Sequence, residues 1–67
     1  MTPAQCRAAR AMVDLSQEDL AKAAAVSLST VRNFEAGRTL PIANNLAAMR
    51  RVLEDAGIIF LDEVAAT

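Results

Sequence analysis

Three polar residues in the middle of the chain, Ser29, Arg32 and Asn33, have the types and the spacing to bind the edges of nucleic-acid bases. If Val31 and Phe34 point to a core, the helical repeat places these three on the opposite side. Asn can form two hydrogen bonds to adenine, Arg can reach guanine or a phosphate, and Ser can serve either. A slender helix with such a face fits the major groove of duplex DNA.

Other polar residues fall at the expected ends of helices, on either side of that face. Gln17 starts a helix, where free backbone N–H groups and partial positive charge can hold a phosphate oxygen. Arg38 lies just beyond the helix that carries Asn33, and Asn44 and Asn45 lie at the start of the next one. These four residues are therefore predicted to bind phosphates.

Two charged residues fall on helix faces that should point inward. Arg10 shares a stripe with Cys6, Ala9 and Val13 in the first helix, and Glu35 lies beside the inward positions of the third. Opposite charges that face a core are costly unless they meet. The spacing predicts an ion pair between these helices; the alternative is that both side chains bend out to solvent.

Capping residues mark the starts of the helices that must position these groups. Thr2 and Gln5 form a capping box with Pro3 between them, and Ser16 and Ser27 can cap the second and third helices. Only two residues separate those helices, which must cross steeply as a helix-turn-helix unit. The pattern predicts an all-α fold, a small bundle of four to five helices. The helices are expected from Pro3 to about Val13, from Gln17 to about Ala24, from Ser27 to near Gly37, and from Pro41 to Ala56.

The fourth helix should turn one row of side chains to the core, at the i, i+3, i+4 spacing. Gly57 then follows as a left-handed cap. The expected inward row is Ile42, Leu46, Met49, Leu53 and Ala56.

Length and composition narrow the classes of protein. The 67 residues suffice for one small domain, and 54% hydrophobic residues with only 3% aromatic ones favour helices over a sheet. With no His and one Cys, the chain lacks the usual catalytic base, the commonest metal ligand, an intramolecular disulfide and a Cys-based zinc site. We therefore expect no enzyme, cofactor or metal site. No apolar run could span a membrane and no signal peptide is evident, so a cytoplasmic protein is expected.

The charge is unevenly distributed along the chain. The formal net charge is -1, but all seven Lys and Arg residues lie at or before Arg51. The acids from Glu54 onward make the tail negative. A basic body with an acidic tail can hold an anionic partner on one side.

The stretch from Ser16 to Pro41 resembles the helix-turn-helix of the Cro and lambda-repressor-like family, also called the XRE family, and the likeness extends from about Arg7 to Leu53. The resemblance implies four or five helices, sequence-specific DNA binding and usually a dimer on an inverted repeat. The matching residues, in register, are Leu15-Ser16-Gln17, Leu20-Ala21, Val26-Ser27, Thr30-Val31, Glu35, Gly37 and Pro41.

By position, the resemblance also implies roles for single residues. Gln17 and Arg38 would contact the DNA backbone, and Arg10 with Glu35 would form a structural ion pair. Ala25 occupies a turn position where the family usually has Gly, so a left-handed alanine is expected there, at a cost on the order of 1 kcal/mol. The base-reading set would be Leu28, Ser29, Thr30, Arg32 and Asn33.

The apolar run Ile58, Ile59, Phe60 and Leu61 follows the last helix. As a strand it would turn Ile58 and Phe60 to one side and Ile59 and Leu61 to the other. Left exposed, the run would be an aggregation hazard. We therefore divide the chain into a domain, residues 1–57, and a dimerisation tail, residues 58–67, that packs across a two-fold axis as a strand or a hydrophobic knob. The alternative is that the tail folds back on its own chain.

Two functions follow from these patterns. The leading hypothesis is a transcriptional regulator of repressor type that binds duplex DNA as a homodimer, with its third helix in the major groove. The alternative is a protein-interaction module of the same fold, such as an antitoxin or antiactivator, whose partner would be a toxin or an activator. Leu28, the negative net charge and the apolar tail favour that alternative. Neither hypothesis involves a membrane.

Overall fold

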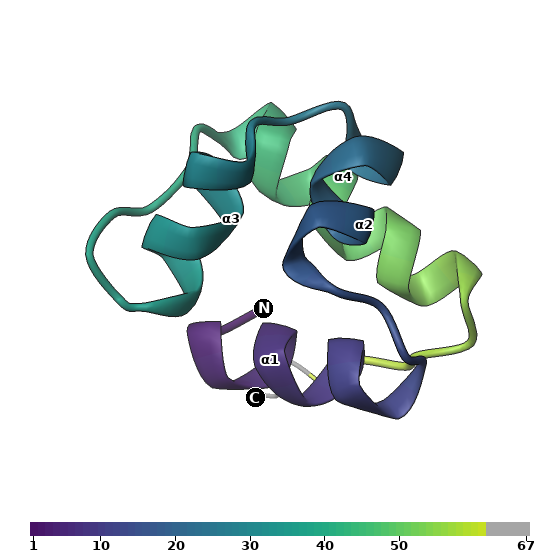
Figure 1. Ribbon diagram of the computed structural model, residues 1–67. Coiled ribbons are helices and arrows are strands. Elements are labelled where there is room, and N and C mark those ends of the chain that lie inside the picture. The colour runs from purple at the N-terminus through teal and green to yellow at the C-terminus, as the bar shows by residue number, and fades with distance from the viewer. Residues whose placement is uncertain (62–67) are drawn as a thin grey trace.

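The structure, a computed structural model, describes residues 1–61, and within that range the chain is helical with no strand. Figure 1 shows α1 along one side of the molecule, with α2 and α3 above it and α4 behind them. Packing of α2 against both α3 and α4 forms the centre, and α1 contacts α3 and α4. The small helical bundle predicted from the sequence is confirmed. The helices are α1 (Pro3–Met12), α2 (Gln17–Ala24), α3 (Leu28–Glu35) and α4 (Ala43–Asp55).

The three predicted helix caps are present. Thr2 Oγ1 accepts a hydrogen bond from the Gln5 N–H at 3.1 Å, and Gln5 Oε1 accepts one from the Thr2 N–H at 2.8 Å. Ser16 and Asp19 form the same reciprocal box at the start of α2, at 2.9 and 3.1 Å. Ser27 Oγ accepts from the Thr30 N–H at 3.0 Å. Each cap pairs an N–H group that the first turn of a helix leaves without a partner.

Each helix is followed within two residues by a residue with positive φ, and the residue after that one donates its N–H to a carbonyl of the helix's last turn. After α1 and α2 these residues are Asp14 (φ 58°) and Ala25 (φ 57°); after α3 and α4 they are Gly37 (φ 75°) and Gly57 (φ 111°). Such turns satisfy the carbonyls that a helix end leaves free. The left-handed Ala25 and the Gly57 cap are as predicted.

The core lies between all four helices and contains small and aliphatic side chains. Glu35, 3% exposed, is the only charged residue among the buried ones in the described range. The buried apolar residues are Cys6, Ala9, Leu20, Ala21, Ala24, Val31, Phe34, Met49 and Leu53.

The inward row predicted for the fourth helix is right at Met49 and Leu53 and wrong at its two ends. Ile42 is 69% exposed, because the helix begins at Ala43, two residues after Pro41, and Ile42 is an extended residue before it (φ -59°, ψ 154°). Ala56 is exposed because it follows the last helical residue. A residue outside the helix does not continue the helical stripe.

The apolar residues after α4 are alternately packed against their own chain and exposed to solvent. Ile58 and Phe60 are half-buried against the core, while Ile59 is 83% and Leu61 86% exposed. The alternation predicted for an extended segment is confirmed, and Ile58 and Phe60 fold back on their own chain. The guanidinium carbon of Arg50 lies 5.2 Å from the centre of the Phe60 ring, a cation–π contact that fastens the tail to α4. The remainder of the predicted tail, residues 62–67, lies outside the described residues.

Candidate nucleic-acid interface

The inner side of α3 fixes which side chains its outer side presents. Val31, Phe34 and Glu35 are buried, and the helical repeat turns Ser29 and Arg32 to solvent. Asn33 is half-buried on the same outer side, and Ala36, which follows the helix, is exposed. The polar face predicted from the sequence is therefore present, and we call Ser29, Arg32, Asn33 and Ala36 the outer face of α3.

Two of the five residues assigned to base reading lie in the first turn of α3, where their side chains are only partly available to a partner. Leu28 is half-buried and packs against the core, so much of its side chain is withdrawn from the outer face. Thr30 is also half-buried, and its hydroxyl lies 2.8 Å from the cap hydroxyl of Ser27. The outer face thus has fewer free polar groups at its start than the sequence suggests.

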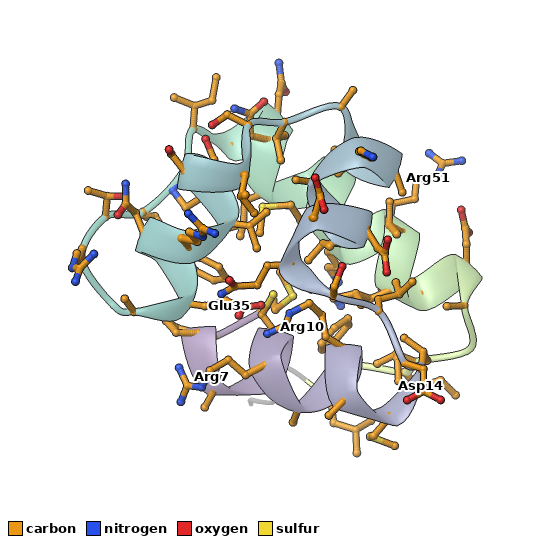
Figure 2. All side chains as sticks on the ribbon, in the orientation of Figure 1. Arg7, Arg10, Asp14, Glu35 and Arg51 are labelled. Atoms are coloured by element: carbon orange, nitrogen blue, oxygen red, sulfur yellow. The ribbon has the colours of Figure 1, made fainter. Side chains whose placement is uncertain are left out.

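Glu35 holds the inner side of α3 to two other helices. Its carboxylate accepts two hydrogen bonds from Arg10, Nε to Oε2 and Nη2 to Oε1, each 2.7 Å long. The Cys6 thiol donates to Oε2 at 3.1 Å, and Gln17 Nε2 donates to Oε1 at 3.0 Å. Figure 2 shows Arg10 and Glu35 meeting between α1 and α3. The predicted ion pair is confirmed, and it is bidentate, which makes it both strong and fixed in geometry.

These contacts set the ionisation of the buried groups. Burial tends to raise the pKa of Glu35, but hydrogen bonds from Arg10, Gln17 and Cys6 outweigh it and hold that pKa below its ordinary value. The hydrogen bond to Glu35 raises the pKa of Arg10. Burial, and then the hydrogen bond to Glu35, raises the pKa of the Cys6 thiol to about 12. Glu35 is therefore a carboxylate at neutral pH, and Cys6 remains a protonated donor.

The remaining residues assigned to phosphate lie at helix ends. Arg38 is exposed in the turn after α3. Asn44 is exposed and Asn45 half-buried in the first turn of α4, which has no side-chain cap. An uncapped helix start offers N–H groups and partial positive charge to an anion. The structure gives Gln17 a partner inside the protein, Glu35, and its contact with phosphate stays a prediction.

Sequence reasoning missed Arg7, which donates a hydrogen bond from Nη1 to the main-chain oxygen of Glu35. Its only signal is its place one helical turn before Arg10, because residues three apart on a helix are neighbours. Cys6 was expected on the buried side of the first helix, but not as a donor to Glu35. Two adjacent residues of α1 therefore bind the same residue of α3.

The geometry is that of two short helices joined by a tight turn, with the second helix anchored inside and polar outside. The sequence profile described as "Helix-turn-helix" matches residues 7–54, which is most of the chain. The chain belongs to this family. It is the helix-turn-helix of the XRE, lambda-repressor-like type, whose members are DNA-binding domains of transcription regulators. No curated protein matches the sequence closely enough to add a relative to this assignment.

Within this helix-turn-helix domain, α2 and α3 are the paired helices and Ala25 and Val26 the turn between them. The helix α3 is therefore the second helix of the pair. In the described part of the chain, no three Cys, Asp or Glu residues gather where they could hold a metal ion. None of the described helices is long and apolar enough to cross a membrane.

Proposed function

We propose that this protein binds specific sequences of duplex DNA and regulates transcription, as a repressor, by placing α3 in the major groove. The outer face of α3 carries this proposal: it is slender, polar and solvent-facing, while Glu35 and its donors hold the opposite side. Asn33 and Arg32 supply the two side chains best suited to base edges, and Ser29 lies beside them.

Backbone contacts would hold that helix in register. Arg38 projects from the turn directly after α3, and the uncapped first turn of α4 follows with Asn44 and Asn45. Phosphate contacts of this kind position a protein on DNA without reading its sequence. Among the described residues, Arg32 and Arg38 are exposed and form no ion pair, so both can neutralise phosphate charge.

Selection of bound sequences from a random duplex library tests the proposal. We expect recovery of an inverted repeat whose half-sites are about one helical turn, 34 Å, apart. Affinity for the recovered duplex should fall steeply between two salt concentrations, yet exceed that for a random duplex at both. Enrichment of no sequence, together with equal affinity for all duplexes, would rule out specific recognition.

An inverted repeat requires two copies of the domain, and we propose that the tail supplies their contact. A groove of about 290 Å³ lies between α1 and residues 58–61, lined by apolar side chains that include Met12 and Leu61. Met12 is 77% exposed and Leu61 86%. A two-fold contact is self-complementary, so the outward row of Ile59 and Leu61 would pack on the same groove of the second copy.

Sedimentation at micromolar concentration checks the dimer. The wild type should sediment as a dimer, and the double variant Ile59→Ser, Leu61→Ser as a monomer. Leu40→Ser is the matched control, because Leu40 is also an exposed apolar residue but lies in the turn before α4, away from the groove. A wild-type monomer would remove the dimer from the proposal and leave the DNA-binding face untouched.

The same apolar groove favours the second candidate function, a protein-interaction module such as an antitoxin or antiactivator. An exposed apolar patch with a polar rim is typical of a protein-binding surface. Absence of duplex binding at low salt, together with a tight complex with a toxin or an activator, would decide for this alternative.

A further inference from the structure

The C-terminal end of α3 is completed by a residue of α1. The last-turn carbonyls of Arg32 and Phe34 accept N–H groups from residues 36 and 37, at 3.0 and 2.9 Å. The Asn33 carbonyl accepts the Arg38 N–H at 2.9 Å. In the described chain no backbone N–H reaches the Glu35 carbonyl, and the Arg7 guanidinium donates to it instead.

The Arg7 contact differs in kind from the buried pair beside it. Arg10 binds the Glu35 side chain in the core, whereas Arg7 is exposed and binds the main chain of the same residue. A cation at this position also interacts favourably with the partial negative charge of the helix end. Figure 2 shows Arg7 on α1 below the end of α3, and Arg51 on another side of the molecule.

We propose that Arg7 is a positioning residue for the recognition helix, which it fixes to α1 at the end from which Asn33 and Arg38 project, without itself contacting DNA. This inference rests on the proposed function. Three positions assigned to the DNA contact lie at that end: the carbonyl of Asn33 pairs with the N–H of Arg38, and Ala36 completes the outer face. A loose helix end would move all of them relative to the base edges.

The test uses the full 67-residue chain and three variants. Arg7→Met keeps the apolar stem and loses the charge and the donors, and Arg7→Lys keeps the charge and a donor. Arg51→Met is the matched control, because Arg51 is an exposed arginine of α4 with no ion pair within the described chain. The probes are the duplex recovered by selection and a random duplex of equal length, each over a salt series.

Arg7→Met should lower affinity for the selected duplex about tenfold, which is close to the lower end of the effect of one hydrogen bond to a charged group. Its affinity for the random duplex should change only as much as that of Arg51→Met, with the wild-type salt slope, and Arg7→Lys should regain most of the loss. Equal losses on both duplexes with a slope lower by about one would make Arg7 a phosphate contact and overturn the proposal. If Arg7→Met bound the selected duplex as tightly as Arg51→Met does, or if Arg7→Lys regained none of the lost affinity, the proposal would be overturned as well.

Amide hydrogen exchange in the free protein separates this inference from the DNA-binding proposal. Arg7→Met should speed exchange at Gly37 and Arg38 about tenfold relative to amides of α4, because those N–H groups close the turn after α3. Arg51→Met should not. If the wild type shows no sequence preference, the proposed function fails, and the exchange result still decides whether Arg7 holds the helix end. Unchanged exchange at Gly37 and Arg38 would show that it does not.

Discussion

The two sides of α3 differ in whether their polar groups are hydrogen-bonded within the protein. On the inner side, the Glu35 carboxylate accepts four hydrogen bonds from three side chains, and its main-chain oxygen accepts a fifth. On the outer side, the side chains of Ser29, Arg32 and Asn33 form no hydrogen bond or ion pair within residues 1–61. The inner side pairs every oxygen of Glu35 within the protein, whereas the three outer side chains keep their donors and acceptors for a partner.

That contrast shows how a domain this small can hold a binding face still. A short helix is not stable alone, and eight residues supply little apolar area for packing. A buried polar network with every group satisfied adds fixed directions that apolar contacts lack. The inner network, which is Glu35 with its donors Cys6, Arg7, Arg10 and Gln17, therefore fixes the rotation of α3. The outer face retains its hydrogen-bonding capacity for a partner.

Removal of the Glu35 side chain should have the largest effect. Glu35→Ala leaves Arg10, Gln17 and Cys6 without their shared acceptor, and breaking such a buried pair costs about 3 kcal/mol. Urea unfolding followed by circular dichroism measures the loss. Glu54→Ala is the control, because Glu54 pairs with Arg50 on the exposed surface of α4 at 2.9 Å, a contact worth about 0.5 kcal/mol. Equal losses in the two variants would contradict the special role of the inner network.

Acid should remove part of the same stabilisation. The pKa of Glu35 is lower in the folded protein than its ordinary value of 4.5, so the unfolded chain takes up the proton first. The contribution of Glu35 is therefore full above pH 4.5 and is lost as the pH falls below it toward the folded-state pKa. Melting temperatures between pH 7 and pH 3 should show this fall in the wild type.

Glu35→Gln should remove most of that pH dependence, because the amide that replaces the carboxyl group does not titrate. Asp19→Asn is the comparison, since a hydrogen bond from the Ser16 N–H also lowers the pKa of Asp19 but at an exposed helix cap. If the pH dependence of stability disappeared in Asp19→Asn and stayed unchanged in Glu35→Gln, the acid-sensitive group would lie outside the inner network.

Changes on the outer side should affect recognition and leave stability alone. Asn33→Ala should reduce discrimination between the selected duplex and a single-base variant by about 1.5 kcal/mol, the value of one side chain's contacts with a base edge. The free energy of unfolding should change by less than about 0.5 kcal/mol. Arg38→Ala should instead weaken all duplexes alike and lower the salt slope by about one. If both variants lost affinity equally for selected and random duplexes, the assigned roles would be wrong.

Patterns that depend on one helix were predictable from sequence. The caps at Thr2, Ser16 and Ser27 are local signals, and the outer face of α3 follows from the helical repeat once Val31 and Phe34 point inward. The Arg10 and Glu35 pair could be predicted although it joins two helices, because burial leaves opposite charges few other solutions.

Other contacts between helices, which depend on how the helices sit against each other, were not predictable. The bond from Gln17 to Glu35 requires the start of α2 to lie beside the end of α3, and that of Arg7 requires α1 to lie below it. Ile42 differs from prediction for another reason: its apolar type fits a core row, but the helix starts one residue after it. Helix boundaries and interhelical placement are properties of the packed molecule.

The smallest predicted effect lies in the turn between α2 and α3, at Ala25, which belongs to neither side of α3. Its left-handed backbone (φ 57°, ψ 41°) crowds the alanine Cβ, and glycine has no Cβ to crowd. Ala25→Gly should therefore stabilise the protein by about 0.5 kcal/mol, after the greater freedom of glycine in the unfolded chain is subtracted. The same change at Ala47, an exposed position inside α4, should destabilise it by about 0.8 kcal/mol. Urea unfolding measures both, and DNA affinity should change in neither. Destabilisation in both variants would show that the turn is not strained, and a change in DNA affinity in Ala25→Gly alone would show that the turn, and not only the inner network, sets the position of α3.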